Sequence, residues 1–431
     1  MQRFASWSES KREEPRQPRR YDAVLGGRLP APPDSALLGG LAGVRQRLAG
    51  GEPAYQITAL TEALRYGEAG IALVVAALDA DIAAVQWRAY QLLRYQFEAA
   101  PDLSIPARLS RDILAVLRGY NPWALFTHER WSAVHDGPIA SLAIAPDGRF
   151  LVSGSHDKTV KVWNLYTGQL LYTLAGHSDW VSAVAIAPNN RTLVSGSVDR
   201  TIKIWDLKTG ALRHIITSPA NFVKSLAIGP EGRTVVSGGV DRTLNIWDLA
   251  SGEMLRILAG HTIFISSVAI APDGSAVASG SADGTLKVWD FRSGRLHCTL
   301  RGLPHLISAV CFSPDSRSLI ASSHDKTIQV WDLPTASLRQ RLIGHLDAVN
   351  DISLSPDGST LFSASFDGAV NVWELRQQRL WHSLNDGASQ ERLLAIAATA
   401  DGQTLVSSSE SGAITIWRAP RLPSAPASPG S

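Results

Sequence analysis

The chain has 431 residues, of which 45% are hydrophobic, so it is long enough to build a large ring-shaped core and one small domain. Its 41 Lys and Arg nearly balance its 39 Asp and Glu, which leaves no overall attraction to nucleic acid or to a membrane surface. Only Cys298 and Cys311 occur, and the longest apolar stretch, residues 71–78, is too short to span a bilayer. The polar opening MQRFASWSESKREE lacks the apolar core of a signal peptide. We therefore expect a cytoplasmic protein with no membrane insertion and no nucleic-acid partner.

Residues 1–35 predict a disordered arm. Their first 20 positions hold six Lys or Arg, three Glu and two Pro, a composition that is typical of a solvated tail.

Residues 36–118 predict an α-helical domain. Apolar residues recur three and four positions apart in segments 57–66, 70–81, 83–96 and 110–118, with Gly67 and Gly70 interrupting the first pair. The stretch ALDADIAAVQWRAYQLL, with its Asp in the turn and an Arg-Ala start to the next helix, resembles a HEAT-type helical repeat. One such repeat cannot bury both of its faces, so we expect this domain to pack against something else.

Residues 119–126 predict an aromatic linker, since Tyr120, Trp123 and Phe126 lie within seven positions. Three aromatic rings so close together favour docking over a free tether, with the alternative that they cover the neighbouring blade. The next segment, residues 127–134, stands where the repeat period would place an outer strand just ahead of the first repeat.

The last 300 residues are a tandem repeat. Seven tryptophans recur at intervals of 42 residues and, at the end, 44. Each unit reads as four runs of six to nine residues rich in Val, Ile, Thr and Leu, bounded by turn residues such as Pro146-Asp147-Gly148. This pattern predicts four β-strands per unit. The tryptophans are Trp163, Trp205, Trp247, Trp289, Trp331, Trp373 and Trp417.

Each unit carries two further signals in fixed phase. An aspartate precedes the tryptophan by six residues in six units, and Ser411 replaces it in the seventh. A histidine precedes the first strand in four units. The aspartates are Asp157, Asp199, Asp241, Asp283, Asp325 and Asp367, and the histidines are His135, His177, His261 and His345.

These phrases resemble the WD-repeat β-propeller family, and the match covers about two-thirds of the chain. The resemblance implies a mainly β fold, a seven-bladed propeller, with the small HEAT-like domain at its N-terminal side, as in bacterial-type members. It also implies that His, Ser or Thr, Asp and Trp form a buried hydrogen-bond chain in each blade. That set is complete in the units of Trp163, Trp205, Trp289 and Trp373. In the other three units Pro219, Leu303 and Ser389 replace the histidine.

The propeller is expected to span residues 127–418, with 127–134 completing the last blade and hiding sheet edges that would otherwise aggregate. The seventh unit is the most degenerate, so we expect local opening to begin there. Residues 419–431, rich in Pro and Ser, predict a disordered tail.

Searches for catalytic chemistry are negative. The sequence holds no Gly-Lys, His-Glu-x-x-His, Cys-x-x-Cys or Gly-x-Ser-x-Gly motif, so we expect no enzyme activity, no metal and no cofactor. The recurring His, Ser and Asp are the residue types of a nucleophilic triad, but a triad occurs once in a chain. The alternative is a ligand-binding or enzymatic propeller that uses the central channel. The segments that we assign to the innermost strands, from SLAIAP to DISLSP, are small and apolar apart from Asp351.

Binding chemistry is predicted on one rim. The residue before each first strand and the residue before each turn aspartate should share the narrow face of the ring, and they are mostly apolar, as in interface cores. This rim includes Trp180, Phe222, Phe264, Leu306, Phe366, His156, His324 and Arg392. Its two histidines either sense pH or are ordinary surface residues.

The leading hypothesis is a non-catalytic scaffold or adaptor that binds a protein or peptide partner through this rim. The alternative is that the rim rings fold inward or contact the chain's own helical domain.

Overall fold

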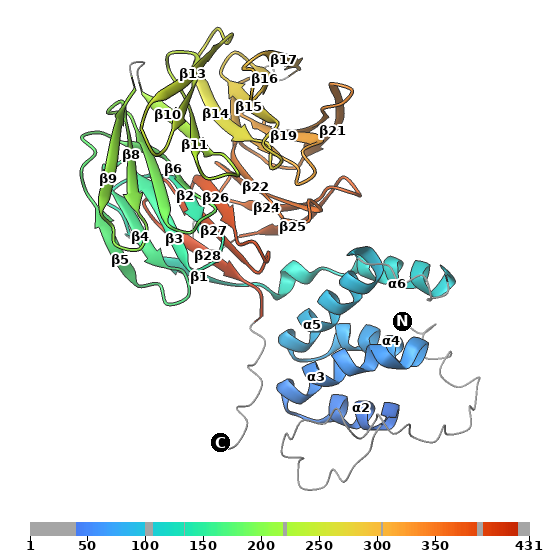
Figure 1. Cartoon of the computed structure of the whole chain (residues 1–431). Coiled ribbons are helices and arrows are strands. Elements are labelled where there is room, and N and C mark those ends of the chain that lie inside the picture. Colours follow the sequence, from blue (N-terminus) through green and yellow to red (C-terminus); the bar gives the residue numbers. More distant parts are fainter. Residues whose placement is uncertain are drawn as a thin grey trace. The chain divides into compact units, whose positions relative to one another are not determined.

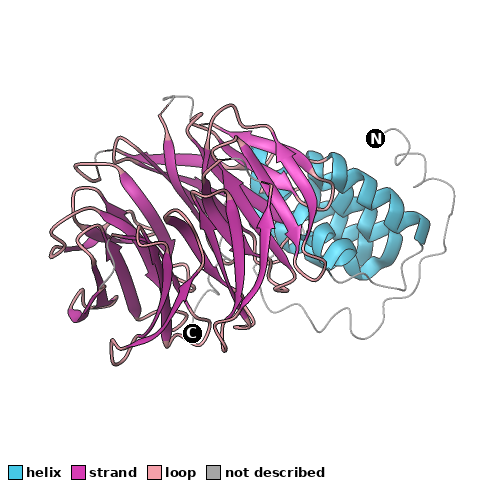
Figure 2. Ribbon diagram, turned by 90° about the horizontal axis from the view of Figure 1, so that it is seen from above, coloured by secondary structure: helices cyan, strands magenta, loops and turns pink. Residues whose placement is uncertain are grey.

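The computed structural model describes residues 40–99, 107–132, 134–218, 222–302, 305–385 and 391–420. Two compact units emerge from it: Met1–Thr127 with Ala419–Ser431, and His128–Arg418. The first is helical in its described part and the second is built of strands (Figure 2). The predicted arm 1–35, most of the tail 419–431, and Pro219, Leu303 and Ser389 lie outside the described residues.

The described part of the helical unit contains one α-helix that the sequence pattern did not predict. Its α-helices are α2 (Gly40–Ala49), α3 (Pro53–Ala63), α4 (Gly67–Ala76), α5 (Ala83–Arg94) and α6 (Ala107–Gly119), and a short π-helix, Tyr95–Ala99, extends α5. The unexpected helix is α2. Its sequence GLAGVRQRLA buries only Gly43 and Val44, and the three apolar residues at helical spacing, Leu41, Val44 and Leu48, are too few to mark a helix clearly.

The linker aromatics pack on α5. The Trp87 ring meets Phe126 edge-on at 5.5 Å between centroids, Tyr90 stacks on Tyr120 at 5.7 Å, and Trp123 lies 4.7 Å from Phe126. Trp87, Tyr90 and Trp123 are all buried. The linker is therefore part of the core of the helical unit.

Gly70 has a different role from the helix break that the sequence analysis assigned to it. The helix α4 begins at Gly67, whose φ of +58° suits glycine, and Gly70 lies inside the helix. A Cβ atom at Gly70 would stand 1.7 Å from the carbonyl oxygen of Ala63. Gly70 is required because the backbone before α4 approaches the helix this closely.

The strands form seven four-stranded antiparallel sheets, which we number as blades in chain order (Figure 1). Blade 1 holds β2 (Ile139–Ile144), β3 (Phe150–Ser155), β4 (Val160–Asn164) and β5 (Leu170–Leu174); blade 2 holds β6 (Val181–Ile186), β7 (Thr192–Ser197), β8 (Thr201–Asp206) and β9 (Leu212–Thr217). Blade 3 holds β10 (Val223–Ile228), β11 (Thr234–Gly239), β12 (Thr243–Asp248) and β13 (Met254–Ala259); blade 4 holds β14 (Ile265–Ile270), β15 (Ala276–Ser281), β16 (Thr285–Asp290) and β17 (Leu296–Arg301). Blade 5 holds β18 (Ile307–Phe312), β19 (Ser318–Ser323), β20 (Thr327–Asp332) and β21 (Ser337–Ile343); blade 6 holds β22 (Val349–Leu354), β23 (Thr360–Ser365), β24 (Val370–Glu374) and β25 (Arg379–Leu384). Blade 7 holds β26 (Leu393–Ala398), β27 (Thr404–Ser409), β28 (Ile414–Arg418) and β1 (Thr127–Trp131).

The blades close into a ring through their first strands. Each of β2, β6, β10, β14, β18, β22 and β26 contacts the corresponding strand of the next blade, and β26 contacts β2. The β1 strand, from the start of the propeller, is the outermost strand of blade 7 and pairs with β28 (Figure 1). This seven-bladed propeller is the predicted fold.

The core lies between blades. One buried cluster joins Leu286 of blade 4 to Ile307 and Trp331 of blade 5, and another joins Ile139 of blade 1 to Ile414 of blade 7. Each sheet therefore buries its apolar faces against its two neighbours, and a single blade has no core of its own.

The close approach at Gly70 generates a stability prediction. Gly70→Ala is expected to lower the free energy of unfolding by about 2 kcal/mol or more, because the new methyl group overlaps a backbone oxygen that cannot rotate away. Gly119→Ala is the matched control, since no described atom lies within 4 Å of its Cβ position. Urea denaturation followed by circular dichroism measures both, and an equal effect of the two substitutions would contradict the packing described.

Candidate functional site

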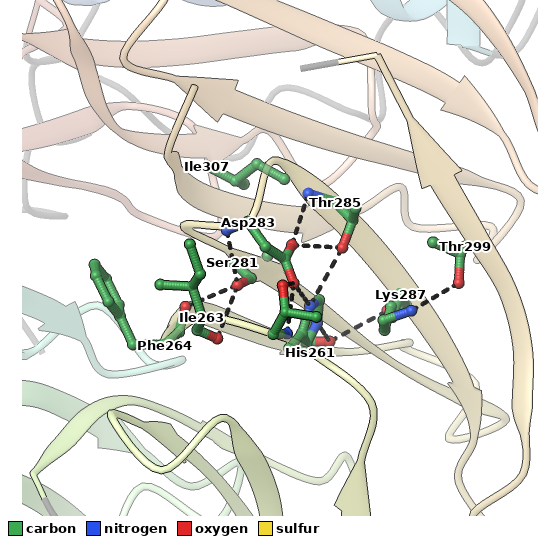
Figure 3. Close-up of polar contacts among 12 residues, drawn as sticks. His261, Ile263, Phe264, Ser281, Asp283, Thr285, Lys287, Thr299 and Ile307 are labelled. Carbon is green, nitrogen blue, oxygen red and sulfur yellow. Dashed lines mark hydrogen bonds and ion pairs between the residues drawn. The ribbon is translucent and has the colours of Figure 1, made fainter. Parts of the chain in front are cut away.

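The polar residues in phase with the tryptophans form a buried hydrogen-bond chain inside the blade, which we call the polar lock. In blade 4, His261 Nδ1 lies 3.0 Å from Asp283 Oδ2 and its Nε2 lies 2.8 Å from Ser279 Oγ, while the Trp289 indole donates to the same hydroxyl at 3.1 Å. Thr285 donates its hydroxyl to Asp283 (Figure 3). Since an ionised carboxylate only accepts, Nδ1 carries the imidazole proton and Nε2 accepts from the serine. Each donor in this chain then has an acceptor: the indole and the imidazole donate to Ser279 and Asp283, and the two hydroxyls donate to His261 and Asp283.

Blades 1, 2 and 6 repeat this chain. The imidazole–carboxylate distances are 2.7, 2.8 and 2.9 Å, and the imidazole–serine distances are 2.7, 2.8 and 2.7 Å. The imidazoles are those of His135, His177 and His345, the carboxylates those of Asp157, Asp199 and Asp367, the hydroxyls those of Ser153, Ser195 and Ser363, and the indoles those of Trp163, Trp205 and Trp373. Four separate copies of one buried arrangement act as structural locks.

Burial and hydrogen bonding set the charges of these groups. Burial lowers the pKa of His261, and the nearby Asp283 only partly opposes that shift. For Asp367 burial alone would raise the pKa, but the hydrogen bond from His345 and two backbone N–H groups outweigh it and hold the pKa at about 2. At neutral pH the chain of blade 4 therefore joins the neutral imidazole of His261 to an ionised carboxylate, since, despite its burial, hydrogen bonds also hold the pKa of Asp283 below its ordinary value.

Blades 3 and 5 keep only part of the chain. In blade 3 Asp241 accepts from the Thr243 hydroxyl and Trp247 donates to Ser237 at 2.9 Å. In blade 5 Asp325 accepts from Thr327 at 2.7 Å, but Ala321 stands where the other blades have serine. The buried indole N–H of Trp331 consequently has no hydrogen-bond acceptor among the described residues.

Blade 7 uses a substitute that the sequence analysis missed. Glu391 accepts from Ser411 at 2.6 Å and from the guanidinium of Arg130, on β1, at 2.7 Å. Trp417 still donates to Ser407, at 3.4 Å, and the His128 ring lies 5.1 Å from it. An ion pair thus ties the β1 strand to the loop that precedes the blade.

The predicted rim residues share one edge of the ring. In every blade the residue before the turn aspartate, or before Ser411 in blade 7, donates its backbone N–H to the carbonyl of the residue before the first strand. The pairs are His156 with Pro138, Val198 with Trp180, Val240 with Phe222, Ala282 with Phe264, His324 with Leu306, Phe366 with Ala348, and Glu410 with Arg392. These fourteen residues make up the rim.

Rim side chains also contact each other between blades. The His156 ring of blade 1 stacks on Trp180 of blade 2 with 4.4 Å between centroids and 8° between planes. The Phe366 ring of blade 6 lies 6.0 Å from the ring of His324 and 4.9 Å from the Arg392 guanidinium. Trp180 is 49% exposed and Phe222 41% exposed, whereas Phe264 and Leu306 are partly buried and Ala348 is buried. The exposed apolar surface is therefore concentrated at blades 2 and 3.

Lys224 is a second residue that the sequence analysis missed. The segment assigned to the innermost strand of blade 3 began two residues too late, at Ser225, and β10 in fact starts at Val223. The Lys224 side chain keeps exposed surface, but burial of its ammonium lowers its pKa. Burial also lowers the pKa of both His156 and His324, and the charge of Lys224 lowers it further. The signal was available in the sequence, because Lys224 is the only charged residue at this position of the seven repeats.

Asp351 joins two blades. Its carboxylate accepts from the backbone N–H of Ile352 at 2.9 Å and from that of Ile396, in blade 7, at 2.8 Å. Ser141, Ser225 and Ser267 occupy the same strand position and accept from the next blade in the same way. Asp351 therefore has a structural bond, which removes the one feature that favoured chemistry at the ring axis. No group of three His, Cys, Asp or Glu side chains that could hold a metal is found among the described residues.

The fold and the hydrogen-bond chain that recurs in four blades define a class of protein. It is the class of β-propellers whose repeats end in a Trp residue that belongs to this hydrogen-bond chain. Six segments match the family model described as WD domain, G-beta repeat: residues 131–164, 168–206, 210–248, 252–290, 294–332 and 336–374. Together they cover more than half of the chain, which belongs to the WD-repeat family. Each matched segment runs from the outermost strand of one blade through the first three strands of the next.

A curated relative is similar over a short stretch. The chain is 37% identical over 51 residues to the nuclear distribution protein PAC1-2 of Postia placenta, which is 12% of either protein. Among the described residues no helix is both long and apolar enough to cross a membrane.

The incomplete lock of blade 5 generates a second prediction. Ala321→Ser is expected to raise the free energy of unfolding by about 1 kcal/mol, because the new hydroxyl gives the Trp331 N–H an acceptor. Ser363→Ala in blade 6 is the matched reverse change and should cost about 1–3 kcal/mol, since it leaves His345 and Trp373 without their shared partner. Urea denaturation followed by tryptophan fluorescence measures both, and a destabilising Ala321→Ser would show that blade 5 has no room for the bond.

The Asp351 carboxyl generates a prediction of pH dependence. Burial raises its folded-state pKa to about 7, above the ordinary value of 3.8, and the two backbone hydrogen bonds only partly oppose this shift. The folded state thus holds the proton more tightly, so the contribution of this group to stability falls as pH rises from about 4 to about 7. Asp351→Asn should remove that fall, and the variant should gain stability relative to wild type between about pH 5 and pH 8. Denaturation midpoints at the two pH values test this, and a constant difference between the proteins would refute it.

Proposed function

We propose that this WD-repeat protein is a non-catalytic scaffold or adaptor in the cytoplasm, which binds a protein or peptide partner through its rim. The observation that carries the proposal is the exposure of Trp180 and Phe222 on the neighbouring blades 2 and 3. Exposed Trp and Phe rings are rare on ordinary surfaces and are enriched where partners bind.

The rest of the propeller supports a binding function. The recurring His, Ser and Asp side chains are engaged in structural locks in four blades, and Asp351 bridges two blades. The Trp180 ring is held flat against His156, so little conformational freedom is lost when a partner covers it. A preorganised aromatic surface of this kind is suited to act as a hot spot.

We propose a second contact through the helical unit. Its resemblance to a HEAT-type repeat rests on the turn and helix start around Asp81 and Arg88, and α4 and α5 lie on either side of that turn. Its linker aromatics are used in its own core, so other faces of the unit would bind. The bacterial type stays a prediction from the sequence.

The rim function is tested by a triple substitution. Trp180→Ala, Phe222→Ala and Phe264→Ala together should leave the ring folded but remove partners recovered from native lysate, and Trp180→Ala alone should cost about 2 kcal/mol or more of binding energy. Quantitative pull-down with calorimetry on a recovered partner measures both effects.

A matched control separates the rim from general surface hydrophobicity. Leu170→Ala, Leu212→Ala and Leu296→Ala remove exposed apolar side chains from the outermost strands of blades 1, 2 and 4, and should change nothing. Partners that survive the rim variant would overturn the assignment and favour a rim used internally against the helical unit.

A further inference from the structure

Lys224 is exceptional among the innermost strands. It is the second residue of β10, and the second residues of the other six strands carry no charge. They are Ala140, Ser182, Ser266, Ser308, Asn350 and Leu394.

The backbone directs this position out of the regular sheet. The register between the first and second strands shifts across it in all seven blades, as between Val223 and Ser225 in blade 3. A bulge of this kind re-aims the side chain of the inserted residue. In blades 2, 4, 5 and 6 the inserted side chain turns toward the neighbouring blade and donates to the carbonyl that opens its first strand. The donors are Ser182, Ser266, Ser308 and Asn350, and the acceptors are Val223, Ile307, Val349 and Leu393.

The lysine is longer than these side chains, and its ammonium reaches further. Its charge acts on His156 of blade 1 and on His324 of blade 5, so the ammonium lies within electrostatic range of rim residues from both sides of blade 3. Lys224 also lies two positions after the rim residue Phe222, so the start of β10 brings the lysine close to the rim.

The acidic side chains in and beside the rim do not pair with this cation. No carboxylate pairs with Lys224 among the described residues. Asp179 and Asp347 each accept from a backbone N–H of the following rim residue, Trp180 and Ala348. Glu410 lies 4.0 Å from Arg392, whose guanidinium also covers Phe366. These acids are therefore engaged elsewhere, and the Lys224 cation is available to a carboxylate that a partner supplies.

We propose that the rim binds an acidic peptide segment, in which one Asp or Glu carboxylate pairs with Lys224 and neighbouring apolar side chains pack on Trp180 and Phe222. The proposal rests on the proposed function and adds the chemistry of the partner. A carboxylate fits better than a phosphate group, since a dianion is usually held by several cations, often arginines, and Arg392 is already engaged. A peptide that covers the rim would exclude water from this ion pair, which strengthens it.

Peptide selection on the intact protein tests this. A phage library of random peptides of about 12 residues, long enough to cross several blades when extended, is selected on wild type and on the Lys224→Met variant. Lys208→Met, which changes an exposed lysine in the turn after β8, is the matched control. Peptides selected on wild type and on Lys208→Met should be enriched in Asp or Glu beside aromatic or aliphatic residues, and those selected on Lys224→Met should not.

Affinity measurements on one selected peptide sharpen the test. Its affinity should fall about tenfold or more on Lys224→Met, and replacement of its acidic residue by the amide should produce the same loss on wild type but no further loss on the variant. Lys224→Arg, which keeps the charge, should retain most of the binding.

The contrary outcomes separate the two proposals. Peptides that need Trp180 and Phe222 but show no acidic enrichment, or bind Lys224→Met equally well, would overturn the acidic partner and leave the rim function standing. Failure to select any peptide above the level of the rim triple variant would overturn both.

Discussion

Ring closure is the constraint on which the rest of the structure depends. No blade has a core of its own, because the apolar side chains of each sheet are buried against the sheets on both sides. A row of such sheets would leave an exposed face at either end, so the row is stable only when its first and last members meet. Blade 7 makes this junction with strands from both ends of the propeller, and the Arg130–Glu391 ion pair holds the strand that comes from the N-terminal side.

The fold could be predicted from the sequence because its signals are local and repeated. The spacing of Trp163 to Trp417 and the turn residues within each unit specify four strands seven times. The helix α2 was not predicted, since its apolar face consists of only Leu41, Val44 and Leu48 in a short stretch that begins with Gly40 and is followed by Gly50 and Gly51. The Glu391 substitute in blade 7 is equally hidden, because Arg130 and Glu391 are 261 positions apart and no local pattern joins them.

The candidate site was only partly predictable for a related reason. The rim follows from strand phase, and its residues could be named by counting from each turn aspartate. Their exposure could not, because it depends on packing between blades: Ala348 is buried while Trp180 stands out. Lys224 was overlooked because the start of β10 was placed two residues late, which removes the lysine from the strand, and the backbone bulge that re-aims it has no sequence signature. Comparison of the repeats position by position does distinguish both Lys224 and Ala321, since each departs from its six counterparts.

The use of β1 in blade 7 also bears on the order in which the ring forms during synthesis. The β1 strand leaves the ribosome directly after the helical unit, but its partner β28 is the last strand of the propeller to emerge. Blades 1 to 6 are each contiguous in sequence and can pair their strands as they appear, whereas the edge of β1 stays open until β28, residues Ile414–Arg418, has been made. The composition of β1 suits a strand that stays unpaired until β28 has been made. Three of the five residues of THERW are ionisable, which discourages an unpaired edge from joining another copy of itself.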